Sequence, residues 1–442
     1  MNVGVRAAIN RQRRPDLRWL RPVVDLVGCG TEGRSTWGVV IARKGLRRFV
    51  FAVATALMVA ASTVGAAGAS PETSPSHSVT LSFPAPTGPY SVGVTELHLI
   101  DPDRADPWDA GRRRELMIQI WYPAEDSTSP PAPWMPLGGQ EAQHVYLTEL
   151  GVPQGSWTLG LSHSHEDLPA RTDIGRFPIL LNSPGMGDTT GWSTAQAEDL
   201  ASHGYVVVAM NHTHEAFAVH FPDGRIERTV VPLDSPQEVL RDLLLPTRVA
   251  DTRFVLDRLA AYVAGQPSDL GNTLPAHLAE NMDLSHVGMF GHSLGGSTTT
   301  QALHDDPRIR AGVNLDGPIL GSVADDGIDR PLLMLASESS PWFGKPGWEP
   351  YWRNNTGSKL PLRVSGTEHM SFCDQQAILP QLATAGLLLA DTRTKAVGSI
   401  DADRSIELQR GYLRVYFDVV FGRVDADIVE AIEHLPEVIP HP

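Results

Sequence analysis

The chain has 442 residues, enough for one large domain or two ordinary ones, and a formal net charge of −15. Its charge is unevenly divided: residues 1–69 carry 11 Lys and Arg against 3 Asp and Glu, whereas residues 70–442 carry 25 basic and 48 acidic side chains. The larger part therefore has a net charge of −23, which argues against a partner that is nucleic acid or an anionic lipid surface.

The basic segment ends in the pattern of a secretory signal peptide. Four basic side chains precede an apolar run over residues 50–64, and the small residues Ala67, Gly68 and Ala69 follow it. We therefore expect a secreted protein in which residues 1–69, an N-terminal extension and a signal peptide, are removed by cleavage near Ala69. An uncleaved membrane anchor is the alternative.

The remaining residues predict a linker and one domain. Residues 70–86 are rich in Ser and Pro, which is typical of a linker. Residues 87–442 begin with two β-like runs at 92–100 and 116–122, followed by a Pro-, Ser- and Gly-rich loop over 124–140. Apolar runs then predict strands at 177–181, 205–210, 285–290, 311–315, 332–336 and 360–364, and helices at 194–203, 246–264 and 410–421.

Apolar strands that alternate with helices predict an α/β fold, with a mostly parallel central sheet and helices on both faces. Within this pattern, Gly-His-Ser-Leu-Gly at 291–295 lies between an apolar strand and a helix expected from Ser297 onward. A Gly-x-Ser-x-Gly sequence at a strand–turn–helix junction indicates the nucleophile elbow of an α/β-hydrolase. Ser293 is therefore the candidate nucleophile, provided that a neighbouring base takes its proton.

In this fold the partners of the serine follow in the order acid and then histidine, each on a loop after a strand. Of the four histidines beyond Ser293, only His369 lies just past a predicted strand; the others are His304, His434 and His441. Asp316 ends the strand at 311–315 and is the preferred acid. The alternatives are the loop residues Asp325, Asp326 and Asp329, and Asp374, which is too close to His369 in sequence to be favoured.

Two backbone N–H groups should bind the oxyanion that forms during ester hydrolysis. One belongs to Leu294, the residue after the candidate nucleophile. The other should come from the glycine-rich loop after the strand at 177–181, and we assign it to Met186; the alternative is a turn without a catalytic role.

Residues 341–352 contain five aromatic residues among three prolines and two glycines, so a regular helix or central strand through them is not expected. We predict that Trp342 and Phe343 lie on a rim at the mouth of the site, where they accept acyl chains or contact a lipid surface transiently. The alternative is that these aromatic residues fill the edge of the core.

We expect no cofactor and no metal. Cys29 would leave with the signal peptide, so Cys373 would have no partner for a disulfide and no second thiol for a metal site. Two His-x-His pairs, His163 with His165 and His212 with His214, have no third ligand at suitable spacing, and solvated loop histidines are the preferred interpretation.

These segments together resemble the platelet-activating factor acetylhydrolase family, in a secreted bacterial branch. The similar segments are residues 87–93, 114–123, 183–187, 199–208, 291–296, 315–316 and 366–369. The chain departs from the family pattern at Pro184, at Leu294, where the family usually has Phe, and at Gly317-Pro318. The resemblance implies calcium-independent hydrolysis of short or oxidised sn-2 acyl chains of phospholipids.

The residues alone predict only ester or related acyl hydrolysis. Together with the resemblance, they lead us to expect a secreted serine esterase that acts on a phospholipid or a similar carboxylic ester. One alternative is a cutinase-like polyester or triacylglycerol hydrolase, whose elbow can have the same sequence. Such enzymes commonly carry a C-terminal disulfide and an acid farther from the serine. A second alternative is a non-catalytic binding protein on the same scaffold, because fold alone does not establish activity.

Overall fold

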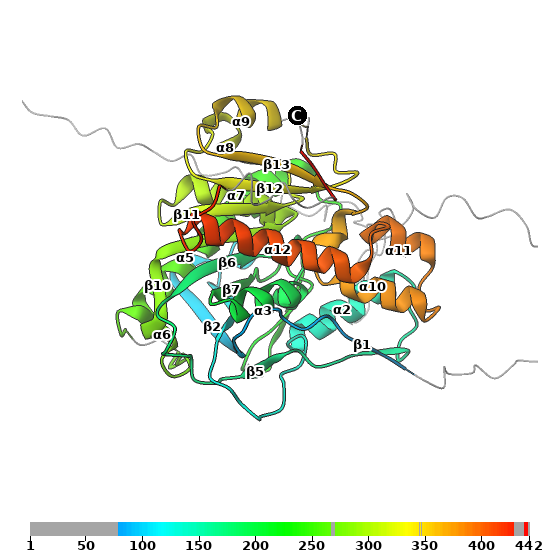
Figure 1. Cartoon of the computed structure of the whole chain (residues 1–442), viewed down its shortest axis with the longest axis horizontal. Coiled ribbons are helices and arrows are strands. Elements are labelled where there is room, and N and C mark those ends of the chain that lie inside the picture. Colours follow the sequence, from blue (N-terminus) through cyan, green and yellow to red (C-terminus); the bar gives the residue numbers. More distant parts are fainter. Residues whose placement is uncertain (1–77, 267–269, 344, 346, 428–436, 441–442) are drawn as a thin grey trace, which may run out of the picture.

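The computed structural model describes residues 78–442 except 267–269, 344, 346, 428–436 and 441–442 (Figure 1). The predicted signal peptide, its cleavage site at Ala69 and the first part of the predicted linker lie outside the described residues. Among the described helices, none has both the length and the apolar character that a membrane span requires.

A ten-stranded sheet forms the centre of the domain, in the order β14-β13-β12-β11-β10-β6-β7-β3-β2-β5. Its middle strands are parallel: β6 (Phe177–Ser183), β7 (Val206–Asn211), β10 (Met282–His292), β11 (Ile309–Leu315), β12 (Leu332–Ser337) and β13 (Lys359–Val364). The remaining strands are β2 (Val92–Ala105), β3 (Arg113–Pro123), β5 (Ser164–Glu166) and β14 (Val438–Pro440), and of these β5 and β14 form the two edges of the sheet. Of the pairs that these strands form, β3–β7, β2–β3 and β13–β14 are antiparallel. The predicted α/β fold with a mostly parallel sheet is confirmed.

Helices cover both faces of this sheet, as the alternating pattern predicts. Helices α3 (Thr194–Ser202) and α12 (Ala402–Val420) lie in front of the sheet in Figure 1 and pack on one face. Helices α5 (Leu245–Val263) and α7 (Leu294–Asp305) pack on the other face. Tyr412 and Tyr416, four residues apart on α12, are both buried, which shows how an apolar stripe at helical spacing attaches a helix to the sheet.

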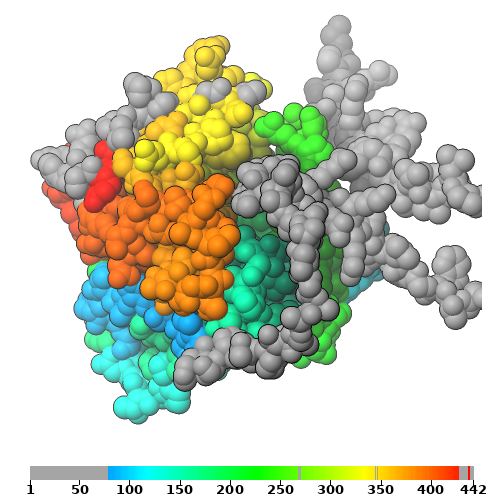
Figure 2. All heavy atoms as spheres, turned by 90° about the vertical axis from the view of Figure 1, so that its right-hand side faces the viewer, coloured from blue at the N-terminus to red at the C-terminus, as the bar shows by residue number. Residues whose placement is uncertain are grey.

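A third apolar cluster lies beside the sheet and was not predicted. It joins helices α2 (Leu137–Glu149), α10 (Gln375–Thr384) and α11 (Ala390–Val397) to strands β1 (Val79–Leu81) and β4 (Trp157–Leu159). Helices α10 and α11 are orange on the face turned to the viewer in Figure 2. Leu81 and Phe83, from the predicted linker, are buried here, so this part of residues 70–86 belongs to the folded domain.

Shorter elements lie in the connections between the main ones. They are β8 (Ala218–His220), β9 (Ile226–Arg228), η2 (Thr190–Ser193), η3 (Leu240–Leu244), η4 (His369–Phe372), α4 (Gln237–Val239), α6 (Leu278–Asn281), α8 (Val323–Asp326) and α9 (Trp348–Asn354).

The turn between β10 and α7 packs against the end of β6 more closely than a side chain would allow. A Cβ at Gly295 would overlap the carbonyl oxygen of Ser183, and one at Gly291 would overlap the carbonyl oxygen of Gly295. Between these glycines, Ser293 has φ 56° and ψ −121°, a strained conformation for a residue with a side chain. Its N–H donates to the carbonyl oxygen of Leu315 at 2.8 Å, which holds the turn against β11.

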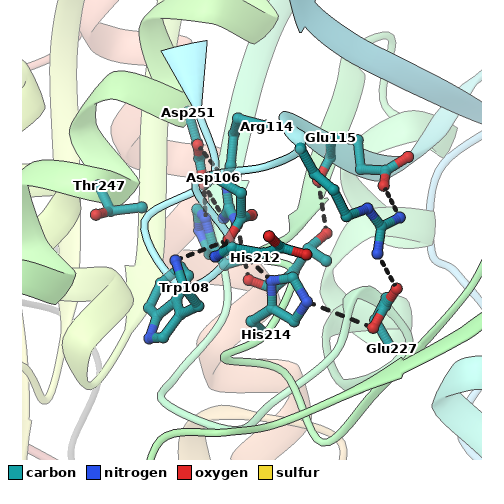
Figure 3. A network of polar contacts seen from close by, with 12 residues as sticks. Asp106, Trp108, Arg114, Glu115, His212, His214, Glu227, Thr247 and Asp251 are labelled. Carbon is teal, nitrogen blue, oxygen red and sulfur yellow. Dashed lines mark hydrogen bonds and ion pairs between the residues drawn. The ribbon is translucent and has the colours of Figure 1, made fainter. Parts of the chain in front are cut away.

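Buried charges join the N-terminal strands to the parallel part of the sheet (Figure 3). Arg114 of β3 pairs with Asp251 of α5 at 2.7 Å and with Asp106 at 3.0 Å. Nδ1 of His212 lies 2.9 Å from Asp251, and Nδ1 of His214 lies 3.1 Å from Asp106. Burial opposes ionisation of both carboxyl groups, but Arg114 and the histidines outweigh it. The pKa of Asp106 is therefore lowered to about 2 and that of Asp251 lies still further below its usual value.

We predict that Gly295→Ala prevents the elbow from packing, because its new methyl group would overlap Ser183. We expect a loss of about 3 kcal/mol of stability, or failure to fold. Gly411→Ala is the matched control, because a Cβ there meets open space within α12. It should stabilise the protein by about 0.5–1 kcal/mol through helix propensity. Thermal melts of both variants check this, and a Gly295→Ala protein as stable as wild type would contradict it.

We predict that the contribution of His214 to stability depends on pH. Its hydrogen bond to Asp106 raises the pKa of His214 above the ordinary 6.5, against the opposing effect of burial. Its stabilisation is therefore complete below the unfolded-state pKa of about 6.5 and is lost as the pH rises through the raised folded-state pKa. The difference in unfolding free energy between wild type and His214→Gln should shrink from about pH 5 to about pH 9. Urea titrations measure it, and a difference that does not vary with pH would refute the prediction.

Candidate active site

Ser293, Asp316 and His369 come together where three parallel strands end. Ser293 follows β10, Asp316 follows β11, and His369 begins η4 after β13. Nε2 of His369 lies 2.9 Å from Oγ of Ser293, and Nδ1 of His369 lies 2.7 Å from Oδ2 of Asp316. The three residues predicted as a group therefore form one continuous hydrogen-bonded chain.

The carboxylate of Asp316 is fixed in direction by its neighbours. Its Oδ1 accepts from the N–H of Ser337 at 3.0 Å, and its Oδ2 accepts from the Ser337 hydroxyl at 3.1 Å. Trp342 Nε1 donates to the Asp316 carbonyl oxygen at 2.7 Å. With the carboxylate aimed at Nδ1, neutral His369 carries its proton on Nδ1 and leaves Nε2 free to accept from Ser293.

The side chains of this hydrogen-bonded triad differ in their exposure to solvent, as ester hydrolysis requires. The side chain of His369 is 42% exposed, whereas that of Asp316 is 1% exposed. A reactant can therefore reach the imidazole while the acid stays shielded from water. Asp374, one of the alternative acids, is committed elsewhere: it accepts from Trp134 Nε1 at 2.7 Å, and burial raises its pKa to about 7.

The two predicted N–H donors belong to the elbow and to the loop after β6. Leu294 is the first residue of α7, so its N–H has no acceptor within the helix. Met186 lies in the loop over 184–188, and no oxygen among the described residues accepts from its N–H. The positive end of the α7 dipole adds to the attraction for an anion beside Ser293.

A polar cluster that the sequence did not suggest lies behind His369. Nε2 of His292 donates to the carbonyl oxygen of His369 at 2.8 Å, and its Nδ1 lies 3.3 Å from Asp188. Asp188 also accepts from the N–H of Gly185 at 3.0 Å. His292 and Asp188 therefore link the elbow, the 184–188 loop and the histidine loop.

The buried Cys373 lies in the same cluster, where its sulfur and the donor atoms of Asp188 and His292 are within 4.8 Å of one another. Burial raises the pKa of the Cys373 thiol well above its usual value. Asp188 and His292 have protein hydrogen-bond partners, so the cluster connects the loops around the site. The number of cysteines in the sequence gives no indication of this cluster, because its other members come from distant parts of the chain.

In the segment 341–352, the expectation of no regular helix is wrong from Trp348 onward, where α9 begins. Pro350 lies in the first turn of α9, where a backbone N–H has no acceptor within the helix in any case. Trp348 and Tyr351 are buried, and the Phe343 ring is 4.6 Å from that of Trp348, so Phe343 is partly a core residue. Trp342 and Phe343 are both half-buried, and the indole N–H of Trp342 donates to the carbonyl oxygen of Asp316. Their role as a substrate rim stays a prediction.

The interpretation of His212 and His214 as solvated loop histidines is wrong, because both are buried in the network of Figure 3. The strand-like run before them gives no sign of their carboxylate partners, which come from α5, the loop before β3 and β9. His163 and His165 are half-buried, and Nδ1 of His163 lies 3.2 Å from Glu198.

The side chain of Arg248 is buried beneath the 184–188 loop, a position that was not predicted from the sequence. A usable signal was present. Arg248 and Asp251 recur at helical spacing with Val255 and Leu259, and all four are buried. A charged residue on the apolar face of a predicted helix indicates a buried polar partner.

Known proteins resemble this chain over most of its length. Residues 76–419 match the model of the family "platelet-activating factor acetylhydrolase, isoform II". A probable 1-alkyl-2-acetylglycerophosphocholine esterase of Arthroderma benhamiae is 26% identical over 382 residues, which cover 81% of this chain and 93% of that protein. A platelet-activating factor acetylhydrolase of Cavia porcellus is 28% identical over 319 residues, 66% of this chain and 69% of that one.

Among solved structures, a ferulic acid esterase from Streptomyces cinnamoneus superposes with a TM-score of 0.63 at 30% identity, covering 81% of this chain and 98% of that chain. The similarity to esterases thus extends over most of the domain, in sequence and in fold. The chain belongs to the platelet-activating factor acetylhydrolase, isoform II, family and is an esterase with an α/β-hydrolase fold.

Proposed function

We propose that the chain hydrolyses carboxylic esters through an acyl-enzyme on Ser293. His369 takes the proton of Ser293 as Oγ attacks the ester carbonyl carbon, and Asp316 orients the imidazole and stabilises its charged form. The oxyanion accepts from the N–H groups of Leu294 and Met186. His369 then protonates the departing alkoxide, and water deacylates the serine by the same steps. The observation that carries this proposal is the hydrogen-bonded chain from Ser293 to Asp316.

For the substrate, we propose a glycerophospholipid with a short acyl chain at sn-2. The family match and the probable 1-alkyl-2-acetylglycerophosphocholine esterase that covers most of this chain support this class. We further propose that the protein is secreted after cleavage near Ala69. With a net charge of −23 after that cleavage, contact with a lipid surface would have to be apolar or with a zwitterionic headgroup.

A hydroxycinnamate ester is a second candidate substrate. The similarity to a ferulic acid esterase, at 30% identity over 98% of that chain, favours it. Both candidates use the same triad and differ in the acyl group that the site must accommodate: a small flexible acetyl group in one case, a flat aromatic acid in the other.

We predict that Ser293→Ala and His369→Ala each lower kcat by about 10⁴–10⁶ without loss of the fold, and that Asp316→Asn costs about 10⁴ because His369 takes the wrong tautomer. Asp325→Asn is the matched control and should be close to silent. Steady-state kinetics with a soluble short-chain ester, together with melting curves, check this. Folded Ser293→Ala protein with near-wild-type activity would falsify the mechanism.

We predict that kcat/KM is higher for 1-alkyl-2-acetylglycerophosphocholine than for methyl ferulate, and falls as the sn-2 chain is lengthened. The comparison should use each phospholipid below and above its micellar concentration, with Ser293→Ala as the blank. A clear preference for methyl ferulate would instead assign the protein to the second candidate substrate.

A further inference from the structure

We infer that Arg248 is a positioning residue for the oxyanion site: it fixes the peptide between Gly185 and Met186 so that the N–H of Met186 points toward the oxyanion. The inference rests on the proposed function, because it concerns one of the two N–H groups assigned there. It adds a residue outside the triad whose loss should lower the rate of the chemical step.

The guanidinium of Arg248 lies directly beneath the loop that carries Met186. Its Nη2 donates to the carbonyl oxygen of Gly185 at 3.0 Å, and its Nη1 donates to that of Pro184 at 2.5 Å. Nη1 also donates to the hydroxyl of Ser183 at 3.2 Å. One side chain therefore holds three consecutive residues at the point where β6 ends and the loop begins.

A buried carboxylate fixes the guanidinium in turn. Nε of Arg248 donates to Glu215 at 2.8 Å, and both side chains are fully buried. A planar guanidinium with one edge on a carboxylate presents its remaining N–H groups in set directions, which a lysine ammonium cannot do. Because the pair has a large desolvation cost, it contributes more to the geometry of the loop than to net stability.

The direction of the Met186 N–H follows from peptide geometry. In a planar trans peptide, the carbonyl group of one residue and the N–H of the next point in opposite directions. The described residues contain no cis peptide bond. Since Arg248 holds the Gly185 carbonyl oxygen on its own side, the Met186 N–H must point away from Arg248.

The other side of the same loop is held by different contacts. The N–H of Gly185 is bound by Asp188 at 3.0 Å, so both peptides of Gly185 have fixed orientations. The elbow packs on the loop as well: a Cβ at Gly295 would come within 2.7 Å of the Pro184 carbonyl oxygen. A loop with two glycines has many accessible conformations without such contacts. Arg248 and Asp188 therefore select the one that presents Met186.

The charge of Arg248 also acts through the peptide. A hydrogen bond to a carbonyl oxygen polarises the whole amide and strengthens the N–H on its other end as a donor. Because Glu215 balances the guanidinium charge, we expect orientation and polarisation to matter more than a direct attraction between Arg248 and the oxyanion.

The test compares Arg248→Lys with Arg410→Lys. Arg410 is the matched control because it is also buried and also donates to three backbone carbonyl oxygens, those of Ala195, Ala85 and Pro84, but none in the oxyanion loop. We expect Arg248→Lys to lower kcat by about 10²–10³, as for loss of one oxyanion donor, with KM changed less than about threefold. Arg410→Lys should lower the melting temperature and leave kcat unchanged.

Two further readouts separate positioning from loss of structure. The affinity of a trifluoromethyl ketone, whose adduct with Ser293 places an oxyanion in the same site, should fall by the same factor as kcat in Arg248→Lys. The pH dependence of kcat/KM should keep its acidic limb, because His369 and Asp316 are untouched. If Arg248→Lys does not fold, Glu215→Gln, which loosens the guanidinium, should show the same pattern with a smaller loss, about tenfold.

A folded Arg248→Lys protein with wild-type kcat and inhibitor affinity would overturn the inference, as would activity losses in both lysine variants that merely follow their melting temperatures. If Arg248→Lys is unfolded, a Glu215→Gln protein that is folded and fully active would overturn it too. The proposed function fails in a different way: wild type would then hydrolyse no ester, or Ser293→Ala would stay active.

Discussion

The site depends on the close approach of the β10–α7 turn to the end of β6. At this point the two backbone segments are in direct contact. Gly295 lies against the carbonyl oxygen of Ser183, and Gly291 lies against the carbonyl oxygen of Gly295. The contact forces Ser293 into a strained conformation at the top of the sheet and starts α7 at the next residue. It also brings the N-terminus of α7 beside the loop of Met186, so that one packing contact places both the nucleophile and the anion-binding groups.

Buried ion pairs stabilise the arrangement around that contact. The Arg114–Asp251 pair contacts His212 and Thr213 just after β7, and the Arg248–Glu215 pair lies under the loop after β6. The two pairs are connected through His212 and Ser183. Nδ1 of His212 faces Asp251, and its Nε2 is 2.9 Å from Oγ of Ser183, which accepts a hydrogen bond from Arg248. Burial, together with the positive charge of Arg248, lowers the pKa of His212, which favours the neutral ring in this position. Such pairs are costly to desolvate, and they define positions more than they add net stability.

The sequence was sufficient to predict the central strands and the elbow, because both are local patterns. A buried parallel strand such as β7 is a continuous apolar run, and the Gly-x-Ser-x-Gly turn has a fixed spacing. Asp316 and His369 could also be predicted as partners of Ser293, because each of them lies just after a predicted strand beyond the elbow. Helices α10 and α11 were missed since α10 contains Pro380 and α11 buries only Val397, so neither shows a regular apolar face.

The polar support of the site could not be predicted, because each contact joins residues far apart in the chain. Asp188 meets His292 across 104 residues, and Arg114 meets Asp251 across 137. The burial of His212 and His214 could not be predicted, because their carboxylate partners come from α5, from the loop before β3 and from β9. Burial of a charged group is decided by the tertiary fold, and only the helical spacing of Arg248 and Asp251 gave an indirect sign of it.

The central claim is that Ser293 carries the acyl group during turnover. The most direct measurement is peptide mass spectrometry of the protein quenched in acid shortly after mixing with an activated acetyl ester. In wild type, an acetyl group is expected on the peptide that contains Ser293 during turnover, and it should be absent once the ester is consumed. Acetylation of a different residue at the rate of turnover, or a burst of product with Ser293 unmodified, would contradict it.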